Sequence, residues 1–258
     1  MTRRESLFMP SQVNLNGKTA LVTGAARRIG AAIATRLHAD GANVAIHHRG
    51  SADASAALAD KLNELRSDSA RTFHTDLADI ATLPGLVKNV VGWHNRLDVL
   101  VNNASAFYPT PLGEITGEHW DDLLGSNLKA PLFLSQAAVP ALRKRNGVIV
   151  NIVDIHARRP LKHHAVYSAA KAGLAMLTRS LAKDLAPGIR VNGVAPGAIL
   201  WPEDGMSDAT RDEILRQVPL ARSGAPEDIA GCVLYLVRDA TYVTGQVISV
   251  DGGRCIGW

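Results

Sequence analysis

The segment from residue 18 to residue 47 constrains the fold of this chain more than any other. Residues 18–23 are a short apolar run typical of a buried strand, and Gly24-Ala-Ala-Arg-Arg-Ile-Gly30 follows it directly. Apolar residues at helical spacing then lead to Asp40-Gly41, and residues 43–47 form a second apolar run. A strand, a glycine-bearing turn, a helix and a second strand within about thirty residues are the local context that a dinucleotide-binding site requires.

The remainder of the chain repeats this alternation of strands and helices. The hydrophobic pattern predicts further helices over residues 53–66, 81–94, 120–143, 167–186 and 226–238, and further strands over residues 70–75, 97–102, 149–153, 189–195 and 246–250. Such alternation predicts an α/β fold, a doubly wound, Rossmann-type parallel sheet flanked by helices in a single domain. We assign residues 15–258 to this domain and residues 1–14 to an N-terminal tail, and we expect helical strain near Pro131.

Composition limits the functions available to such a domain. The 258 residues are 47% hydrophobic, and no apolar stretch approaches the ~18 residues that a membrane-spanning helix needs. The N-terminus lacks the apolar segment of a secretory signal, so we expect a cytoplasmic protein without a membrane partner. The net charge of +4 is spread over small clusters, which is not typical of a nucleic-acid surface. Cys232 and Cys255 have no companions at metal-ligand spacing, so we expect reduced thiols and no metal site.

The glycine-bearing turn is a candidate phosphate-binding site. The amides and dipole of a helix N-terminus attract a pyrophosphate, and glycines let the backbone approach it closely. We therefore expect Gly24, Arg27, Arg28, Ile29 and Gly30 to bind a dinucleotide cofactor, with a plain structural turn as the alternative. Arg28 then points either to solvent or onto the phosphates.

The end of the second strand indicates which dinucleotide is preferred. A carboxylate about twenty residues past the first glycine would accept hydrogen bonds from the adenosine ribose and repel a phosphate there. No acid is present at that place, and the segment contains His48, Arg49 and Ser51 instead. A guanidinium beside these groups can hold a 2′-phosphate, so we expect NADPH, with a solvated polar loop as the alternative.

Three further strand ends carry residues suited to the same ligand, because the carboxyl ends of parallel strands meet at one edge of a sheet. These candidate cofactor-binding residues are Asp76 and Leu77, Asn103 and Ala104, and Pro196 and Gly197. Trp201 lies in residues 199–204, a loop on the same side that can form a lid with Trp201 as a wall for the substrate. The polar stretch from His156 to His164 is expected to be a solvated or substrate-entrance loop.

Phe107 and Asn127 each have two interpretations. Phe107 lies in a loop with Tyr108 and two prolines, where it either stacks on a planar substrate or plugs the space beneath the loop. Asn127 is polar among leucines on a predicted helix, and a buried amide needs hydrogen-bond partners. It either braces a neighbouring backbone or organises a water that carries protons.

Asp154, Tyr167 and Lys171 form the most informative constellation in the chain. Asp154 follows the predicted strand 149–153, Tyr167 comes thirteen residues later, and Lys171 lies one helical turn beyond it. A phenol with a pKa of about 10 transfers protons poorly at neutral pH, so we expect the Lys171 ammonium to favour its anion. We also expect Tyr167 and Lys171 to bind the cofactor, with Lys171 reaching the ribose hydroxyls of the nicotinamide half. A carbonyl reductase would place a hydroxyl donor at position 154. A carboxylate instead accepts hydrogen bonds from an amino-heterocycle or protonates a ring nitrogen, which favours a planar C=N substrate over a ketone.

Several motifs together resemble the short-chain dehydrogenase/reductase family, and the match covers essentially the whole chain after residue 15. They are the turn from Thr23 to Gly30, Asn102-Asn103-Ala104, Asn127, Tyr167 with Lys171, and Pro196-Gly197. Within that family the chain is similar to the pteridine reductases. The features shared with them are Arg28 where a glycine is usual, His48-Arg49, the stretch from Asn103 to Leu112, and Asp154 in place of a serine.

This resemblance implies NADPH-dependent reduction of a pterin such as dihydrobiopterin, biopterin or dihydrofolate. It implies that the pterin lies between the nicotinamide and Phe107, with Arg28 reaching both the pyrophosphate and the substrate. Asp154 and Tyr167 would deliver a proton to a ring nitrogen, and Ser105 would contact the cofactor or the pterin.

The sequence leaves two other functions open, and the resemblance implies an oligomeric state. The chain is alternatively an NADPH-dependent carbonyl reductase of the same family, or a catalytically silent NADPH-binding regulatory protein. The intact pair of Tyr167 and Lys171 argues against the silent protein. By analogy with the family, the helices around Asn127 and Lys171 would pair in a homotetramer.

Overall fold

The computed structural model describes residues 14–199 and 207–256. Most of the tail expected at residues 1–14 lies outside these residues. So do Trp201 and all but the first residue of the lid expected at 199–204.

One parallel sheet forms the centre of the molecule. Its strands are β1 (Thr19–Val22), β2 (Asn43–His48), β3 (Ala70–His74), β4 (Val99–Asn102), β5 (Val148–Ile152), β6 (Arg190–Pro196) and β7 (Val247–Val250). They are hydrogen-bonded in the order β3-β2-β1-β4-β5-β6-β7, and every pair is parallel.

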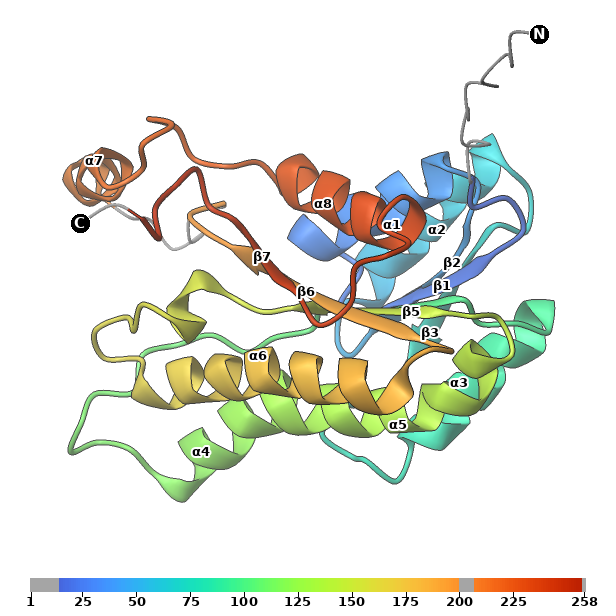
Figure 1. Cartoon of the computed structure of the whole chain (residues 1–258), viewed down its shortest axis with the longest axis horizontal. Coiled ribbons are helices and arrows are strands. Elements are labelled where there is room, and N and C mark those ends of the chain that lie inside the picture. Colours follow the sequence, from blue (N-terminus) through green and yellow to red (C-terminus); the bar gives the residue numbers. More distant parts are fainter. Residues whose placement is uncertain (1–13, 200–206, 257–258) are drawn as a thin grey trace, which may run out of the picture.

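Helices cover both faces of this sheet (Figure 1). They are α1 (Arg28–Ala39), α2 (Ala52–Leu65), α3 (Leu83–His94), α4 (Gly117–Leu124), α5 (Ala130–Arg143), α6 (Ala165–Leu185), α7 (Asp208–Arg216) and α8 (Pro226–Arg238). Helices α1, α2 and α8 lie on one face, and α3, α4, α5 and α6 lie on the other. The single-domain, doubly wound α/β fold predicted from the sequence is confirmed.

The core divides into two layers because side chains of a strand alternate between its faces. Val99 and Val101 of β4 pack on the side of α1 and α8, whereas Leu100 between them packs with residues of α3 and α5. All three are buried, as is usual where helices cover both faces of a parallel sheet.

The strand order reverses between β1 and β4. Connections leave the two strands toward opposite faces of the sheet, so a crevice opens at their carboxyl ends, which is where ligands bind in sheets of this kind. The loops that follow β1, β4 and β5 therefore supply the residues around this crevice.

The helical region predicted over residues 120–143 is present, and it contains one irregular turn. Helix α4 passes into a π-helical turn, η1 (Gly125–Lys129), before α5 begins, and the N–H of Ala130 bonds to the carbonyl of Gly125. Pro131 has no N–H for the carbonyl of Asn127, so a regular α-helical ladder cannot form across this point. The irregular turn lies just before Pro131, near the place where strain was predicted.

Helix α7 was not predicted. The Ser207 hydroxyl caps it by accepting a hydrogen bond from the N–H of Thr210 at 3.2 Å. None of its residues is buried, so the sequence has no apolar stripe there to indicate a helix.

Within residues 14–199 and 207–256, no helix is long and apolar enough to cross a membrane. The same part of the chain holds no group of three or more His, Cys, Asp or Glu residues that could bind a metal ion. Cys232 and Cys255 are free thiols.

Candidate active site

Two loops at the crevice are fastened together by Thr23 and Asn103. The Thr23 hydroxyl accepts hydrogen bonds from the N–H of Asn103 at 2.9 Å and of Ala104 at 3.0 Å. In return the Asn103 amide donates to the carbonyls of Thr23 at 2.8 Å and Gly24 at 3.1 Å. The loop after β4 is therefore held against the turn after β1, and Asn103 braces the turn as well as lining the crevice.

The turn before α1 requires its glycines. A side chain at Gly30 would meet the Gly24 carbonyl and would lie 2.6 Å from the Asn103 amide nitrogen. Gly24 itself has a φ of +60°, in the left-handed region that glycine adopts readily. The space left free lies at the N-terminus of α1, so the turn fits the pyrophosphate of a dinucleotide.

Arg28 is the exception in this turn. It adopts a φ of +53° although it carries a Cβ, in the left-handed conformation that costs ordinary residues roughly 1–2 kcal/mol. The strained backbone places an exposed guanidinium at the first residue of α1, where it lines the crevice.

His47 holds the turn from the other side, and sequence reasoning did not identify it. Its Nδ1 accepts a hydrogen bond from the N–H of Gly24 at 3.2 Å, so its Nε2 carries the proton that bonds to the Thr75 carbonyl at 3.0 Å. Burial lowers the pKa of His47 to about 4, and the neutral ring is thus kept in one tautomer. A histidine at the end of a strand is the only indication that the sequence offers.

Most of the predicted cofactor-binding residues line one cavity of about 410 Å³. They are Gly24, Arg27, Arg28, Ile29 and Gly30 of the turn, Arg49 after β2, Asp76 and Leu77 after β3, and Asn103, Ala104 and Ser105 after β4. Arg49 provides a cation where a ribose phosphate would need one.

His48 and Ser51 are not brought into this cavity. His48 is buried, and its ring packs 5.4 Å from the ring of His74 on β3. Burial lowers the pKa of His48, and the electrostatic effect of the neighbouring His74 acts in the same direction. Ser51 is the residue before α2, but its side chain makes no capping hydrogen bond.

A second cavity of about 530 Å³ adjoins the first and contains the predicted catalytic residues. Asp154, Tyr167 and Lys171 line it, together with Phe107 and the pair Pro196-Gly197. Arg28, Ile29, Asn103 and Ser105 line both cavities. The cavity at the predicted cofactor site is therefore continuous with the cavity at the predicted substrate site, which is called the substrate cavity.

The three titratable groups meet because a strand end faces a helix. Asp154 follows β5 and caps the short 3-10 helix η2 (Ile155–Ala157), accepting from the N–H of His156 at 2.8 Å. The Tyr167 hydroxyl donates to the other carboxylate oxygen of Asp154 at 2.7 Å. One turn along α6, the Lys171 ammonium donates to the Ile152 carbonyl at 3.0 Å and lies 5.7 Å from the Tyr167 ring centroid.

These contacts reverse one expectation. Lys171 was expected to favour the Tyr167 anion, but burial and then the negative charge of Asp154 raise the pKa of Tyr167 far above its ordinary value. The carboxylate is hydrogen-bonded to the phenol, whereas the ammonium is held at a backbone carbonyl. Burial also lowers the pKa of Lys171 to about 8, and Asp154 opposes this only in part. The phenol stays protonated, which is the state that a proton donor in a reduction needs.

Asn127 braces the loop after β4. The buried amide donates to the carbonyl of Ala106 at 2.9 Å, and its oxygen accepts from the Ser105 hydroxyl at 2.6 Å. It also donates to the Leu123 carbonyl at 2.9 Å, one turn earlier in α4. Of the two interpretations from the sequence, the backbone brace is present in this structure.

Phe107 lies on the wall of the substrate cavity and does not fill the space beneath its own loop. Its side chain is 53% exposed, which a plug would not be. The ring stacks on His164 with centroids 4.8 Å apart and meets Tyr167 edge-on, also at 4.8 Å.

Sequence reasoning missed several other residues of the substrate cavity. Ile214 of α7 and Arg254 after β7 line it. His156 and Leu161 also line it, and they belong to the stretch that was expected to be a solvated or substrate-entrance loop. No local motif marks them, because only the fold brings these segments to the same edge of the sheet.

Comparison with known proteins gives the family of the chain. A family model described as enoyl-(acyl carrier protein) reductase matches residues 24–254. A 3-oxoacyl-(acyl-carrier-protein) reductase from Staphylococcus aureus is 40% identical over 240 residues, covering 92% of this chain and 97% of its own. Pteridine reductase 1 from Leishmania tarentolae is also 40% identical, over 276 residues, covering 91% of this chain and 95% of its own.

Solved structures agree with this result. A protein described as a short-chain alcohol dehydrogenase from Sinorhizobium meliloti superposes with a TM-score of 0.91 at 31% identity, covering 96% of this chain and 100% of the other. A short-chain dehydrogenase/reductase variant from Serratia marcescens gives a TM-score of 0.88 at 34% identity, covering 94% of this chain and 99% of the other.

Proposed function

The chain belongs to the short-chain dehydrogenase/reductase family of oxidoreductases, which use nicotinamide cofactors, and we propose that it reduces a pterin with NADPH. The proposed substrates are dihydrobiopterin, biopterin and dihydrofolate. The observation that carries the proposal is the 2.7 Å hydrogen bond from the Tyr167 hydroxyl to the Asp154 carboxylate. A hydroxyl donor at position 154 would suit a ketone, whereas a carboxylate suits an aminopterin ring.

The preference for NADPH rests on charge at the ribose end of the cofactor cavity. Arg49 lines that cavity directly after β2, and no carboxylate stands at the end of this strand. A cation there stabilises a 2′-phosphate that an aspartate would repel. NADPH would supply the hydride, and the turn before α1 would hold its pyrophosphate.

The side chains of the substrate cavity would divide the remaining work. Asp154 accepts hydrogen bonds from the amino and N–H groups of the pterin, and Tyr167 gives its proton to a ring nitrogen. The buried Lys171 ammonium stabilises the negative charge that then develops on the phenol. The half-exposed ring of Phe107 offers a flat apolar surface on which the heterocycle can stack.

A second candidate is favoured by the 40% identity to a 3-oxoacyl-(acyl-carrier-protein) reductase. In that case the substrate is a ketone, and the Asp154 carboxylate would face the oxygen on which negative charge develops. Because that contact is repulsive, we rank ketone reduction below pterin reduction. A catalytically silent NADPH-binding regulator is the third possibility, and the Tyr167 and Lys171 pair argues against it.

The test is the oxidation of NADPH by the purified protein with a panel of substrates. We expect turnover with dihydrobiopterin or dihydrofolate and much weaker turnover with acetoacetyl-CoA and simple ketones. Turnover of ketones without turnover of any pterin would refute the proposal. A Tyr167→Phe variant that keeps its biological function would instead support the silent regulator.

We further propose that the protein is a homotetramer built through α4, α5 and α6. Trp120 and Met176 are about half exposed on these helices, where a second copy would cover them. Sedimentation velocity should give a species of four chains, and a monomer at micromolar concentration would refute this assembly.

A further inference from the structure

The substrate cavity has a cationic part that the proposed chemistry does not use. Arg254 and His156 line the cavity that also contains Tyr167 and Lys171. Tyr167 and Lys171 are buried, whereas Arg254 is half-buried, so the guanidinium lies nearer to solvent than the reacting groups. A substrate reduced at Tyr167 would extend toward it.

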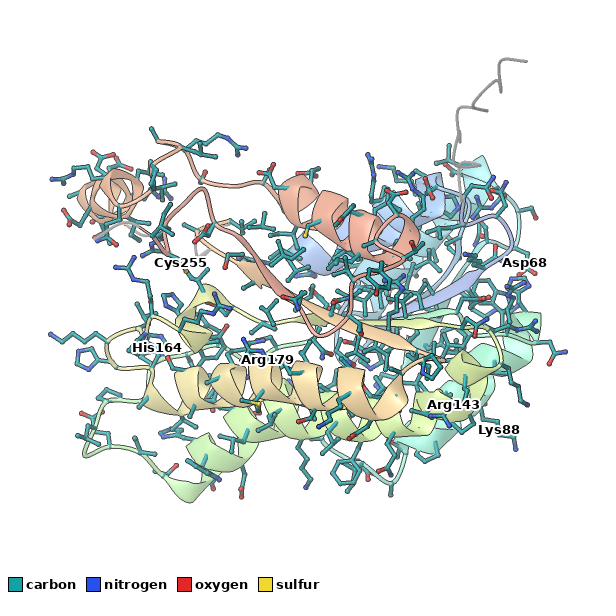
Figure 2. All side chains as sticks on the ribbon, in the orientation of Figure 1. Asp68, Lys88, Arg143, His164, Arg179 and Cys255 are labelled. Atoms are coloured by element: carbon teal, nitrogen blue, oxygen red, sulfur yellow. The ribbon has the colours of Figure 1, made fainter. Side chains whose placement is uncertain are left out.

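The loop before α6 adds positive charge beside Arg254. Residues 155–166 contain Arg158, Arg159 and Lys162 as well as three histidines, and no acidic residue. The Arg159 guanidinium donates a hydrogen bond to the backbone carbonyl of Arg254, which fastens this loop to the C-terminal segment. Figure 2 shows His164 of the loop and Cys255 of the segment at the same end of the molecule.

The surroundings of Arg254 disfavour the charged form of its guanidinium. Burial lowers the pKa of Arg254, and the positive charge of Arg159 lowers it further, while Asp154, Cys255 and Asp251 act in the opposite direction. Among the described residues, no carboxylate lies within ion-pair distance of this guanidinium. A charge partly removed from water beside a like charge gains most from an anion that binds next to it.

We propose that Arg254, which lines the cavity and is fastened to the loop by Arg159, binds an anionic tail of the substrate. The tail would be a carboxylate, as in the glutamate of a folate, or a phosphate, as in a phosphopantetheine thioester. The inference deepens the proposed function and rests on it only in taking this cavity as the place where substrate is reduced. Arg254 would then be a specificity residue, acting on affinity and not on the chemical step.

Two pairs of substrates test this inference, and in each pair only one member carries an anionic tail. Dihydrofolate is compared with dihydrobiopterin, and acetoacetyl-CoA with the uncharged acetoacetyl-N-acetylcysteamine. Steady-state rates are measured with NADPH, and dissociation constants for folic acid, biopterin and the two thioesters are measured by calorimetry on the protein saturated with NADP⁺. The variants are Arg254→Met and Arg254→Lys. The control is Arg158→Met, which removes an equal charge from an exposed residue of the same loop that does not line the cavity.

For at least one pair, we expect Arg254→Met to raise KM and the dissociation constant of the tailed member about tenfold, as for one charge-assisted hydrogen bond. The constants of the tailless member and the kcat of both should change less than about twofold. Arg254→Lys should restore part of the affinity, and Arg158→Met should have little effect. In the wild-type protein, salt should weaken binding of the tailed member selectively, which requires no variant.

The inference is overturned if Arg254→Met affects both members of each pair equally, if the wild-type protein shows no preference for a tail, or if neither tailed ligand binds. Its failure is separate from failure of the proposed function. A tail effect in the thioester pair, without binding or turnover of any pterin, would refute pterin reduction and leave the inference standing. Reduction of both dihydropterins without a tail effect would do the reverse.

Discussion

Asp154 changes what the neighbouring phenol can do. Its carboxylate accepts a hydrogen bond from the Tyr167 hydroxyl, and together with burial it raises the pKa of that hydroxyl. A phenol that holds its proton is a donor, so the free protein is arranged for reduction and is poorly arranged for removing a proton from an alcohol. The sign of this effect depends on burial and on a 2.7 Å contact, neither of which residue spacing reveals.

Lys171 should set the upper limit of the pH range in which the protein is active. Burial lowers the pKa of Lys171 to about 8, so the ammonium that stabilises the developing phenolate is lost above that pH. We expect kcat/KM for reduction to fall about tenfold per pH unit above about 8, measured with saturating NADPH. A rate that stays constant to pH 10 would contradict this role. Lys171→Met should give a low rate with no inflection near pH 8.

The left-handed backbone conformation of Arg28 should lower the stability of the fold, while its charge contributes to cofactor binding. At a φ of +53°, glycine is favoured over alanine, so Arg28→Gly should be about 1 kcal/mol more stable to unfolding by urea than Arg28→Ala. Both variants should bind NADPH more weakly. Arg36 lies within α1, where the order of the glycine and alanine variants should reverse. Equal stabilities of the two Arg28 variants would show that no strain is present.

The π-helical turn η1 is the element that positions Asn127 beneath the loop after β4. Its amide reaches Ala106 and Leu123 while its oxygen holds Ser105. In Pro131→Ala the restored N–H can bond to the Asn127 carbonyl and favours a regular helix. We expect kcat to fall about tenfold or more because the loop that lines both cavities shifts. Pro140→Ala in α5 is the control, and an equal loss in both variants would contradict the explanation.

Elements were predictable from the sequence where a periodic pattern was present. The spacing of Tyr167 and Lys171 predicted that they share one face of α6, as they do in the structure. The strand before Asp154 predicted that this carboxylate faces them, and its hydrogen bond with Tyr167 agrees with that prediction. Helix α7 was missed because it buries no residue. The π-helical form of η1 was missed because it depends on the missing N–H of Pro131 and not on a periodic pattern. Local patterns do not carry information of these two kinds.

At the scale of the whole molecule, the active site lies along the edge of the sheet formed by the carboxyl ends of its strands. The loops after β1, β4 and β5 and the segment after β7 meet there, and each supplies residues to the two joined cavities. The sequence predicted the residues that belong to known motifs. It did not predict Arg254 or His47, because their roles depend on which segments the strand order brings together.

His47 should couple the stability of the whole fold to pH. Burial lowers the pKa of His47 to about 4, below the value of about 6.5 in an unfolded chain, so acid protonates the unfolded state first. This contribution is present above pH 6.5 and is lost as the pH falls to 4, up to about 3 kcal/mol. In urea unfolding, His47→Asn should show a smaller loss over this range, since its amide oxygen can accept the Gly24 N–H without titrating. Parallel curves for the two proteins would contradict the assignment.

The role of Asp154 in selecting the substrate is tested most directly by the ratio of kcat/KM for dihydrobiopterin to that for acetoacetyl-CoA, measured with NADPH in the wild-type protein and in Asp154→Ser. We expect a ratio above one in the wild type. In the variant, pterin reduction should fall about a hundredfold while ketone reduction rises, because a hydroxyl donor then faces the substrate. A wild-type protein that reduces only the ketone, or a ratio that the substitution leaves unchanged, would contradict the claim that Asp154 selects the substrate.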